Sequence, residues 1–320
     1  MSTRISVVIP AFNAAAYLTE TVQSLLSQLS DHDEILVVDD GSTDNTCAVC
    51  ADISDPRVRL VQRANSGGPA APRNAGCREA TGEYIFLFDS DDIAEPDKIS
   101  VAMKALENSP KASFLFTNFS LADSNGVITE HRYLDRYSVL KQLEKSPAGT
   151  NTYTVNGGRL LAALLRANFV GTCSVVFRKS VWLRTEGFNE NLRHLDDRDM
   201  WLQLCRHGDA VFVDHSSFRY RKHESGISSQ RIRAQHLERV AVAERVKQWD
   251  LDTEQKNAVH TLAAKNYLKL GYIDFHDQGN IELARNWFAR SFINRPSYPA
   301  FKGMIKSVVP QKLYLMLSRN

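Results

Sequence analysis

The first hundred residues alternate between short apolar runs and segments with helical spacing. The apolar runs are Ile5–Pro10, Glu34–Val38, Val58–Val61 and Tyr84–Phe88, and the helical segments are Ala14–Leu29, Asp44–Asp52 and Pro72–Ala80. Apolar strands that alternate with helices are typical of parallel β-α-β units. The sequence therefore predicts an α/β fold built on a doubly wound, mostly parallel sheet.

Polar residues follow three of these strands at the point where each strand ends. They are Pro10–Asn13, Asp39–Asp40 and Asp89–Asp91. In doubly wound sheets, ligands bind outside the carboxyl ends of the strands. We therefore expect a ligand site at this edge of the sheet.

The fourth apolar run ends in a cluster of carboxylates. Asp89 and Asp91 are two residues apart, so on a strand both side chains point to the same side. Carboxylates at the end of a buried strand are costly unless a cation meets them, and Mg²⁺ or Mn²⁺ prefers such oxygen ligands. An acidic turn that caps the next helix is the alternative explanation.

The remaining pattern predicts two domains, residues 1–230 and residues 231–320. Further strands are expected at 112–117, at 173–177 and from 210, with helices at 158–167 and 199–207 and a variable loop or hairpin at 123–150. From about Ala234 the pattern is wholly helical. Asn266–Pro296 resembles one tetratricopeptide hairpin, and a plain helical hairpin packed on the first domain is the alternative.

The end of the chain combines apolar and basic residues. Phe301–Leu317 carries a series of apolar side chains beside Lys302, Lys306 and Lys312. Such a segment either contacts an anionic membrane surface or docks as an amphipathic helix. We therefore expect that residues 299–320 could make a peripheral membrane contact.

Composition excludes several classes of protein. A net charge of +2 without a basic arm argues against nucleic-acid binding. The start of the chain lacks the pattern of a signal peptide, and no apolar run reaches the length of a membrane span, so we expect a cytoplasmic protein. Cys47 and Cys50 form C-x-x-C, which we interpret as core packing rather than as a zinc or redox site.

Five motifs occur in order between residues 4 and 229. They are Ile5–Asn13, Val37–Asp44, Asn65–Gly68 with Pro72–Gly76, Phe88–Asp92 with Pro96, and Gly187–Glu190 with Asp196–Leu202. Together they resemble the family 2 glycosyltransferases, which have a GT-A fold. The resemblance implies an inverting transfer of sugar from a nucleotide diphosphate donor, a UDP-sugar, to a hydroxyl of a glycan or lipid-linked acceptor. It also implies Mn²⁺ or Mg²⁺ and a role in bacterial surface polysaccharide synthesis. The helical pattern after residue 230 adds a C-terminal all-helical extension to the GT-A domain.

The resemblance assigns donor contacts at the sheet edge. The residues are Pro10, Ala11, Phe12, Asn13, Asp40, Arg73, Asp89 and Ser90. Asp40 would accept a hydrogen bond from the uracil, with a helix cap as its alternative role. Phe12 would pack on the base where the family commonly has Tyr, or else lie in the core. Arg73 would contact the diphosphate or the base region, or else be a surface cation.

The resemblance also assigns the metal ligands and the base. Asp91 is the expected metal ligand, with Asp89 nearer the ribose or the waters of the metal, and His223 in Tyr220–Ser225 would approach the metal or the diphosphate. Asp197 would be the general base. Crowding by Asp196 and Asp199 should raise its pKa, whereas an acidic helix N-terminus is the alternative explanation of the three carboxylates.

Three other classes of protein compete with this interpretation. A sugar-nucleotide nucleotidyltransferase would need a basic, glycine-rich loop after the first strand, where Ala11–Asn13 stands instead. A receiver domain would also place Asp39–Asp40 after a strand, but it gives no reason for the motifs at 187–202. A non-catalytic scaffold derived from a transferase would have no need of intact Asp91 and Asp197.

Overall fold

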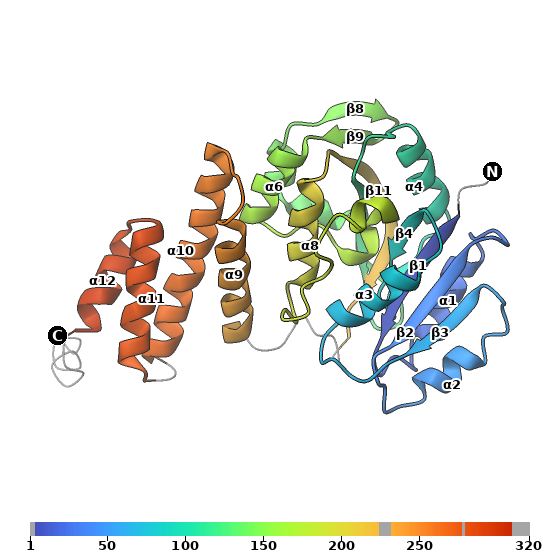
Figure 1. The fold of residues 1–320 in the computed structure, drawn as a ribbon, viewed down its shortest axis with the longest axis horizontal. Helices are drawn as coiled ribbons and strands as arrows, with labels where there is room; N and C mark the ends of the chain where they lie inside the picture. Colours follow the sequence, from blue (N-terminus) through green and yellow to red (C-terminus); the bar gives the residue numbers. More distant parts are fainter. Residues whose placement is uncertain (1–3, 224–231, 277–278, 309–320) are drawn as a thin grey trace. The chain divides into compact units, whose positions relative to one another are not determined.

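The protein, described here from a computed structural model, consists of two compact units, Met1–Ile227 and Ser228–Asn320 (Figure 1). The structure describes residues 4–223, 232–276 and 279–308. The expected domain boundary between residues 230 and 231 lies outside the described residues. The division of roles between the two domains therefore stays a prediction.

One mixed sheet organises the first unit. Its strands lie in the order β3-β2-β1-β4-β10-β6-β11-β9-β8, with β5 on β11 and β7 on β6. The strands are β1 Ile5–Ala11, β2 Glu34–Asp39, β3 Val58–Gln62, β4 Tyr84–Leu87, β5 Ile93–Ala94, β6 Phe114–Ala122, β7 Ile128–Glu130, β8 Ser146–Gly149, β9 Thr152–Val155, β10 Val176–Arg178 and β11 Ala210–Arg221. The first four strands are parallel, and β10 runs antiparallel to both β4 and β6.

Helices connect these strands. They are α1 Leu18–Leu26, α2 Thr46–Ala51, α3 Ala70–Glu79, α4 Lys98–Glu107, the 3₁₀ helix η1 Tyr133–Arg136, α5 Ser138–Gln142, α6 Gly157–Arg166, the 3₁₀ helix η2 Thr172–Ser174, α7 Lys179–Trp182 and α8 Asp196–Cys205. β1, β2 and β4 are buried along almost their whole length. Fully apolar strands of this kind are typical of a parallel sheet that is covered on both faces.

Several elements differ from the sequence expectation. Strand β6 continues to Ala122 instead of ending at 117, and the polar side chains of Asn118 and Ser120 are buried within it. Cys173 and Ser174, which were expected in a strand, form the 3₁₀ turn η2. The backbone N–H groups of Ser174 and Val175 donate to the carbonyls of Gly171 and Thr172, both at 3.0 Å, so the strand begins only at Val176.

Helix α3 packs closely on the parallel strands. A Cβ atom added at Gly76 would lie 2.4 Å from Cγ1 of Val8 and 3.1 Å from Cγ2 of Val38. Val8 and Val38 are fully buried in β1 and β2. Gly76 therefore allows the helix backbone to approach the sheet that carries the donor-side loops.

We expect Gly76→Ala to lower the free energy of unfolding by about 1–3 kcal/mol, the usual cost of overpacking a core. Helix propensity alone predicts the opposite sign, a gain of about 1 kcal/mol. Urea denaturation would measure the difference, with Ala75→Gly as the control for propensity at the half-buried neighbouring position. A variant as stable as the parent would contradict the close packing.

The second unit is helical throughout its described part. Its helices are α9 Ile232–Val246, α10 Thr253–His276, α11 Ile281–Asn294 and α12 Tyr298–Lys306. They lie side by side in chain order (Figure 1). The Phe288 ring fills the space between helices, because a Cβ at Gly271 or at Gly303 would lie 2.5 Å from it. Helices α10 and α11 form the expected hairpin, whose likeness to a tetratricopeptide repeat stays a prediction.

None of the helices in the described ranges is long and apolar enough to cross a lipid bilayer. The expected membrane-contacting tail, residues 299–320, is described only as far as Val308. The rest of that tail lies outside the described residues.

Candidate functional site

The carboxyl ends of β1 and β2 are tied together by their loops. Ala11 lies opposite Asp39 in the parallel register, and the Asp40 N–H donates to the Ala11 carbonyl at 2.8 Å. Asn13 adopts a left-handed backbone with φ of 51°. Its backbone N–H donates to Ser42 Oγ at 2.9 Å, and its side-chain oxygen accepts the Thr43 N–H at 2.8 Å. The structure thus joins the two predicted donor loops into one surface.

Asp40 lies buried at this surface. Its carboxylate accepts the Ser66 N–H at 3.0 Å and pairs with Arg63 at 3.1 Å. Asp44, rather than Asp40, accepts the N–H of Thr46 at the start of α2, at 3.0 Å. The alternative role of Asp40 as a cap of this helix therefore has no support in the structure.

Phe12 directly follows β1 and is exposed at the same surface. Half of its surface is accessible (50%), so the alternative that Phe12 is a core residue is wrong. The two residues before it belong to β1, where Ala11 is buried and Pro10 half-buried. The aromatic ring is therefore the part of this segment that a planar ligand can reach.

Arg73 joins the carboxylate turn to the acidic helix. Its guanidinium donates to Asp196 Oδ2 at 2.6 Å and to Asp89 Oδ1 at 2.7 Å. The Arg73 side chain is only 5% exposed, so the alternative of a surface cation is wrong. Burial disfavours the cation, but the charges of Asp196 and Asp89 dominate and raise the pKa of Arg73. Two motifs that are far apart in the sequence therefore meet at one buried cation.

Asp197 follows at the start of α8 and is half-buried. Burial, and then the negative charge of Asp196, raise its pKa to about 7. Asn168 Nδ2 lies 3.4 Å from Asp197 Oδ2. The expected raised pKa is therefore confirmed in direction, and a carboxylate that titrates near neutral pH can take up a proton.

Asp91 pairs with His223. The His223 Nε2 atom lies 2.9 Å from Asp91 Oδ2, and the Asp91 side chain remains 32% exposed. Burial and the neighbouring charge of Asp89 raise the pKa of Asp91. The structure thus brings together two of the three residues expected to bind metal, from sequence positions far apart.

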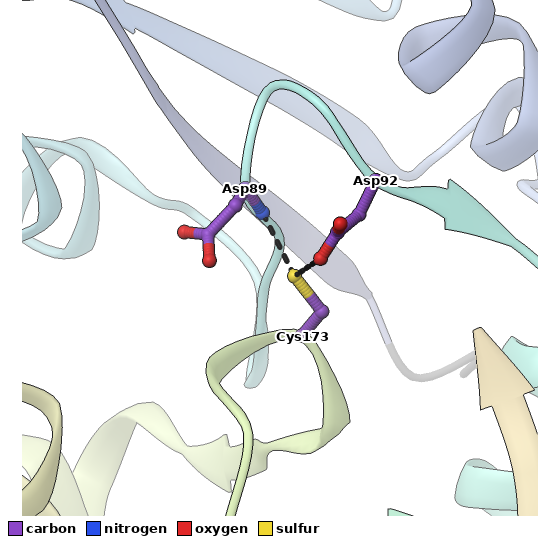
Figure 2. Close-up of side chains that lie close together, drawn as sticks. All are labelled: Asp89, Asp92 and Cys173. Atoms are coloured by element: carbon purple, nitrogen blue, oxygen red, sulfur yellow. Dashed lines mark hydrogen bonds between the residues drawn. The ribbon is translucent and has the colours of Figure 1, made fainter. Parts of the chain in front are cut away.

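Asp92, by contrast, faces the protein interior. Figure 2 shows the Cys173 sulfur between the Asp89 backbone nitrogen and the Asp92 carboxylate, with the Asp89 carboxylate turned away. The Asp89 N–H donates to the sulfur at 3.0 Å, and the thiol donates to Asp92 at 3.0 Å. Burial raises the pKa of the Cys173 thiol and of Asp92 well above their usual values. Asp89, Asp92 and Cys173 have potential ligand atoms within 4.8 Å of one another, but their hydrogen bonds indicate a support for the turn.

Sequence reasoning missed the residues that hold these groups in place. Arg221 donates its backbone N–H to Asp92 at 2.9 Å and its side-chain Nε–H to the Asp91 carbonyl at 2.8 Å. Asn74 binds the loop before α8 through the Phe188 carbonyl and the Phe188 N–H, both at 2.8 Å. Arg221 lies in Tyr220–Ser225 and Asn74 in Pro72–Gly76, so these two motifs were the only sequence evidence that pointed to them. Asn168 carries no such signal in one sequence.

Ser90 also lies in the carboxylate turn, and it is half-buried. Its carbonyl accepts the Thr21 hydroxyl at 3.1 Å, and the same hydroxyl donates to the Asp92 carbonyl at 2.8 Å. Thr21, on α1, therefore fixes the backbone of this turn. A donor contact of Ser90 remains a prediction.

Comparison with known proteins relates this arrangement to characterised chains. The model of glycosyl transferase family 2 matches residues 6–181. The glycosyltransferase GlyG of Streptococcus pneumoniae is 38% identical over 39% of this chain and 42% of its own length. The match thus spans less than half of that relative. The Escherichia coli UDP-Glc:alpha-D-GlcNAc-diphosphoundecaprenol beta-1,3-glucosyltransferase WfgD is 24% identical over 84% of this chain and 92% of its own.

Two solved structures share the fold. Staphylococcus aureus TarS in complex with UDP-GlcNAc superposes with a TM-score of 0.70 at 18% identity, over 95% of this chain and 89% of its own. The mannosyltransferase PcManGT of Pyrobaculum calidifontis, solved with GDP-Man and Mn²⁺, superposes with a TM-score of 0.56 at 17% identity, over 96% of this chain and 80% of its own. These likenesses confirm the expected GT-A fold with a helical extension. The family model covers more than half of the residues, and the chain belongs to glycosyl transferase family 2.

Proposed function

We propose that this protein is an inverting, metal-dependent glycosyltransferase. It moves a sugar from a nucleotide diphosphate, a UDP-sugar, to a hydroxyl of a glycan or lipid-linked acceptor in bacterial surface polysaccharide synthesis. The observation that carries the proposal is the bridge made by Arg73 between Asp89 and Asp196. It sets the carboxylate turn, where the donor diphosphate would lie, beside the helix that carries Asp197.

The donor would occupy the carboxyl ends of β1, β2 and β4. Phe12 offers an exposed ring for the base, and Asp40 offers a carboxylate that can accept an N–H from it. The choice of UDP is supported by the name of WfgD and by the ligand in the TarS structure. The lipid-linked acceptor is supported by the name of WfgD alone.

The acceptor hydroxyl would be activated by Asp197. With a pKa of about 7, this carboxylate is partly ionised at neutral pH and can remove the hydroxyl proton as the oxygen attacks the anomeric carbon. Attack from the face opposite the diphosphate inverts the configuration at that carbon. Asp196 would keep the pKa of Asp197 raised, and Arg73 would balance the charge of Asp196.

The residues present fit a hard divalent cation. Asp91 and Asp89 supply partly exposed carboxylate oxygens, and His223 lies in hydrogen-bond contact with Asp91. Mg²⁺ and Mn²⁺ favour such oxygen-rich sets, and Mn²⁺ is present in the PcManGT structure. When bound, the cation would supply positive charge against the departing nucleoside diphosphate.

A location in the cytoplasm at the inner face of the membrane fits a lipid-linked acceptor. Helix α12 exposes Tyr298, Phe301 and Ile305 at intervals of three and four residues, with Lys302 beside them. Apolar residues at this spacing form one stripe along a helix. Vesicle sedimentation with and without anionic phospholipid would test this peripheral contact.

We expect Asp91→Asn to abolish metal-dependent release of nucleoside diphosphate. The measurement is release of the nucleoside diphosphate from a panel of UDP-, GDP- and dTDP-sugars, with Mn²⁺ and with EDTA. The matched control is Asp97→Asn, because Asp97 pairs with His215 at 2.9 Å as Asp91 does with His223. The parent and the control should release diphosphate from one donor only in the presence of metal.

Other results would favour the competing functions. Absence of release and of donor binding by calorimetry would favour a scaffold derived from a transferase. Formation of a nucleoside triphosphate from the donor and pyrophosphate would favour a nucleotidyltransferase. Release that persists in EDTA and in Asp91→Asn would overturn the metal-dependent mechanism while leaving the transferase assignment in place.

A further inference from the structure

We propose that Tyr133 and Tyr137 form an aromatic shelf on which a sugar ring of the acceptor stacks during transfer. The inference rests on the proposed function, because it concerns the acceptor side of the same site. Both residues lie in the segment between β7 and α6, Tyr133 in η1 and Tyr137 directly before α5.

Residues 168–173 run from Asp197 to the carboxylate turn. Asn168 lies 3.4 Å from Asp197, and the Val170 carbonyl accepts the Trp201 Nε1–H of helix α8 at 3.2 Å. At the other end, Cys173 contacts Asp89 and Asp92. An acceptor hydroxyl must reach both the base and the anomeric carbon of the donor. An acceptor sugar that reaches from Asp197 to the carboxylate turn would therefore lie along this segment.

Aromatic rings cover the same segment. The Tyr137 ring lies 6.0 Å from the ring of Phe169, which directly follows Asn168. The Phe119 ring lies 5.0 Å from Tyr133 and would contact a Cβ at Gly171 at 3.2 Å. Tyr133 and Tyr137 contact each other with ring centroids 6.0 Å apart. The shelf thus reaches from the neighbour of Asn168 to the middle of the segment.

Burial distinguishes the two layers of these rings. Phe119 and Phe169 are buried, whereas Tyr133 and Tyr137 are half-buried and keep part of their surface in contact with solvent. The phenylalanines therefore support the shelf. The Arg136 guanidinium lies 4.1 Å from the centre of the Tyr133 ring, so Tyr137 provides the stacking surface and Tyr133 borders it. Burial, and then the neighbouring Tyr133, raise the pKa of Tyr137 to about 12, and the two tyrosine side chains hydrogen-bond to each other.

A buried amide holds the shelf in place. Asn118 is fully buried, and its side-chain oxygen accepts the Leu134 N–H at 3.0 Å. Its Nδ2 donates to Asp214 at 3.0 Å, and Arg132 donates to the same carboxylate at 2.7 Å. Arg132 also has a left-handed backbone with φ of 51°. A segment held in this way presents its rings in one arrangement, which reduces the entropy lost on binding.

A sugar ring suits such a surface. Its C–H groups form an apolar face, and its hydroxyls require polar partners at the edge of that face. Binding sites of this kind combine aromatic side chains with a few placed polar groups. The shelf supplies the rings and the Tyr137 hydroxyl, and the Asn168 side chain beside Asp197 supplies an amide.

The test uses the full chain, the donor and metal that support UDP release, and p-nitrophenyl glycosides of glucose, galactose, mannose and N-acetylglucosamine. We expect at least one glycoside to accelerate release. Tyr137→Leu should raise the KM for that glycoside about tenfold, the loss of one good aromatic contact. Donor KM and the slow release to water should stay within about twofold. Tyr137→Phe keeps the ring and should lie between Tyr137→Leu and the parent.

The matched control is Tyr153→Leu, which removes a half-buried tyrosine whose ring stacks on Phe212 at 6.2 Å. It should leave the glycoside KM unchanged. An unchanged KM in both Tyr137→Leu and Tyr133→Leu would overturn the shelf, and so would a panel without effect while release to water persists. Absence of any donor turnover would instead overturn the proposed function, together with this inference.

Discussion

Asp197→Asn is expected to lower the rate of sugar transfer by about 10²–10⁴, the usual contribution of a general base. The amide has nearly the shape of the carboxylate but cannot accept the acceptor proton. Asp197 does not contact Asp89 or Asp91 in the structure, so donor binding should persist. Isothermal titration with UDP would check the binding, and product formation would check the rate.

The pH dependence of the parent gives an independent reading of the same group. Burial and the charge of Asp196 raise the pKa of Asp197 to about 7. The ionised form is the active base, so activity should increase as the pH rises through about 7 and should level off above it. In Asp197→Asn the residual activity should lack this acid limb. A parent profile that is flat from pH 5 to pH 8, or a variant that keeps the limb, would contradict the assignment of the base.

The sequence predicts the donor half of the fold better than the acceptor half. β1, β2 and β4 are continuous apolar runs, and each lies within one residue of its expected bounds at its N-terminal end. Strand β6 continues past its expected end at 117 and includes Asn118. That residue is buried with its amide satisfied by Asp214 and the Leu134 N–H, partners that no local pattern reveals.

Buried charged residues near the site also could not be predicted from the sequence. Lys98 follows a turn and reads as a surface residue, yet it is 1% exposed. It donates to the Cys173 carbonyl and lies 5.3 Å from the centre of the Phe88 ring, and burial lowers its pKa to about 8. Motifs identify which residues are candidates for chemistry. Their exposure and partners depend on contacts between distant segments, which one sequence does not contain.

Arg73→Met should cause the largest loss of stability among single changes at the site. Removing one partner of a buried ion pair leaves an uncompensated charge and costs about 3–5 kcal/mol. Here the uncompensated group is Asp196, whose side chain is 3% exposed and which already has a pKa raised by burial. Methionine fills much of the volume of the arginine stem, so the loss reflects charge more than packing. Urea denaturation followed by circular dichroism would measure the loss.

Two further variants separate the buried bridge from a general effect of arginine removal. Arg59 is 47% exposed and pairs with Glu79 at 3.3 Å and with the buried Glu34 at 3.7 Å. Because Glu34 keeps its hydrogen bonds from Ser6 and Thr81, Arg59→Met should cost at most about 1 kcal/mol. The double variant Arg73→Met with Asp196→Asn should recover part of the loss, because it also removes the stranded carboxylate. Arg73→Lys should be almost as destabilised as Arg73→Met, because one ammonium group does not reproduce the two separate N–H contacts of the guanidinium with Asp89 and Asp196. Equal losses in Arg73→Met and Arg59→Met would show that the bridge does not stabilise the fold, and that the carboxylate turn and α8 are held together by other contacts.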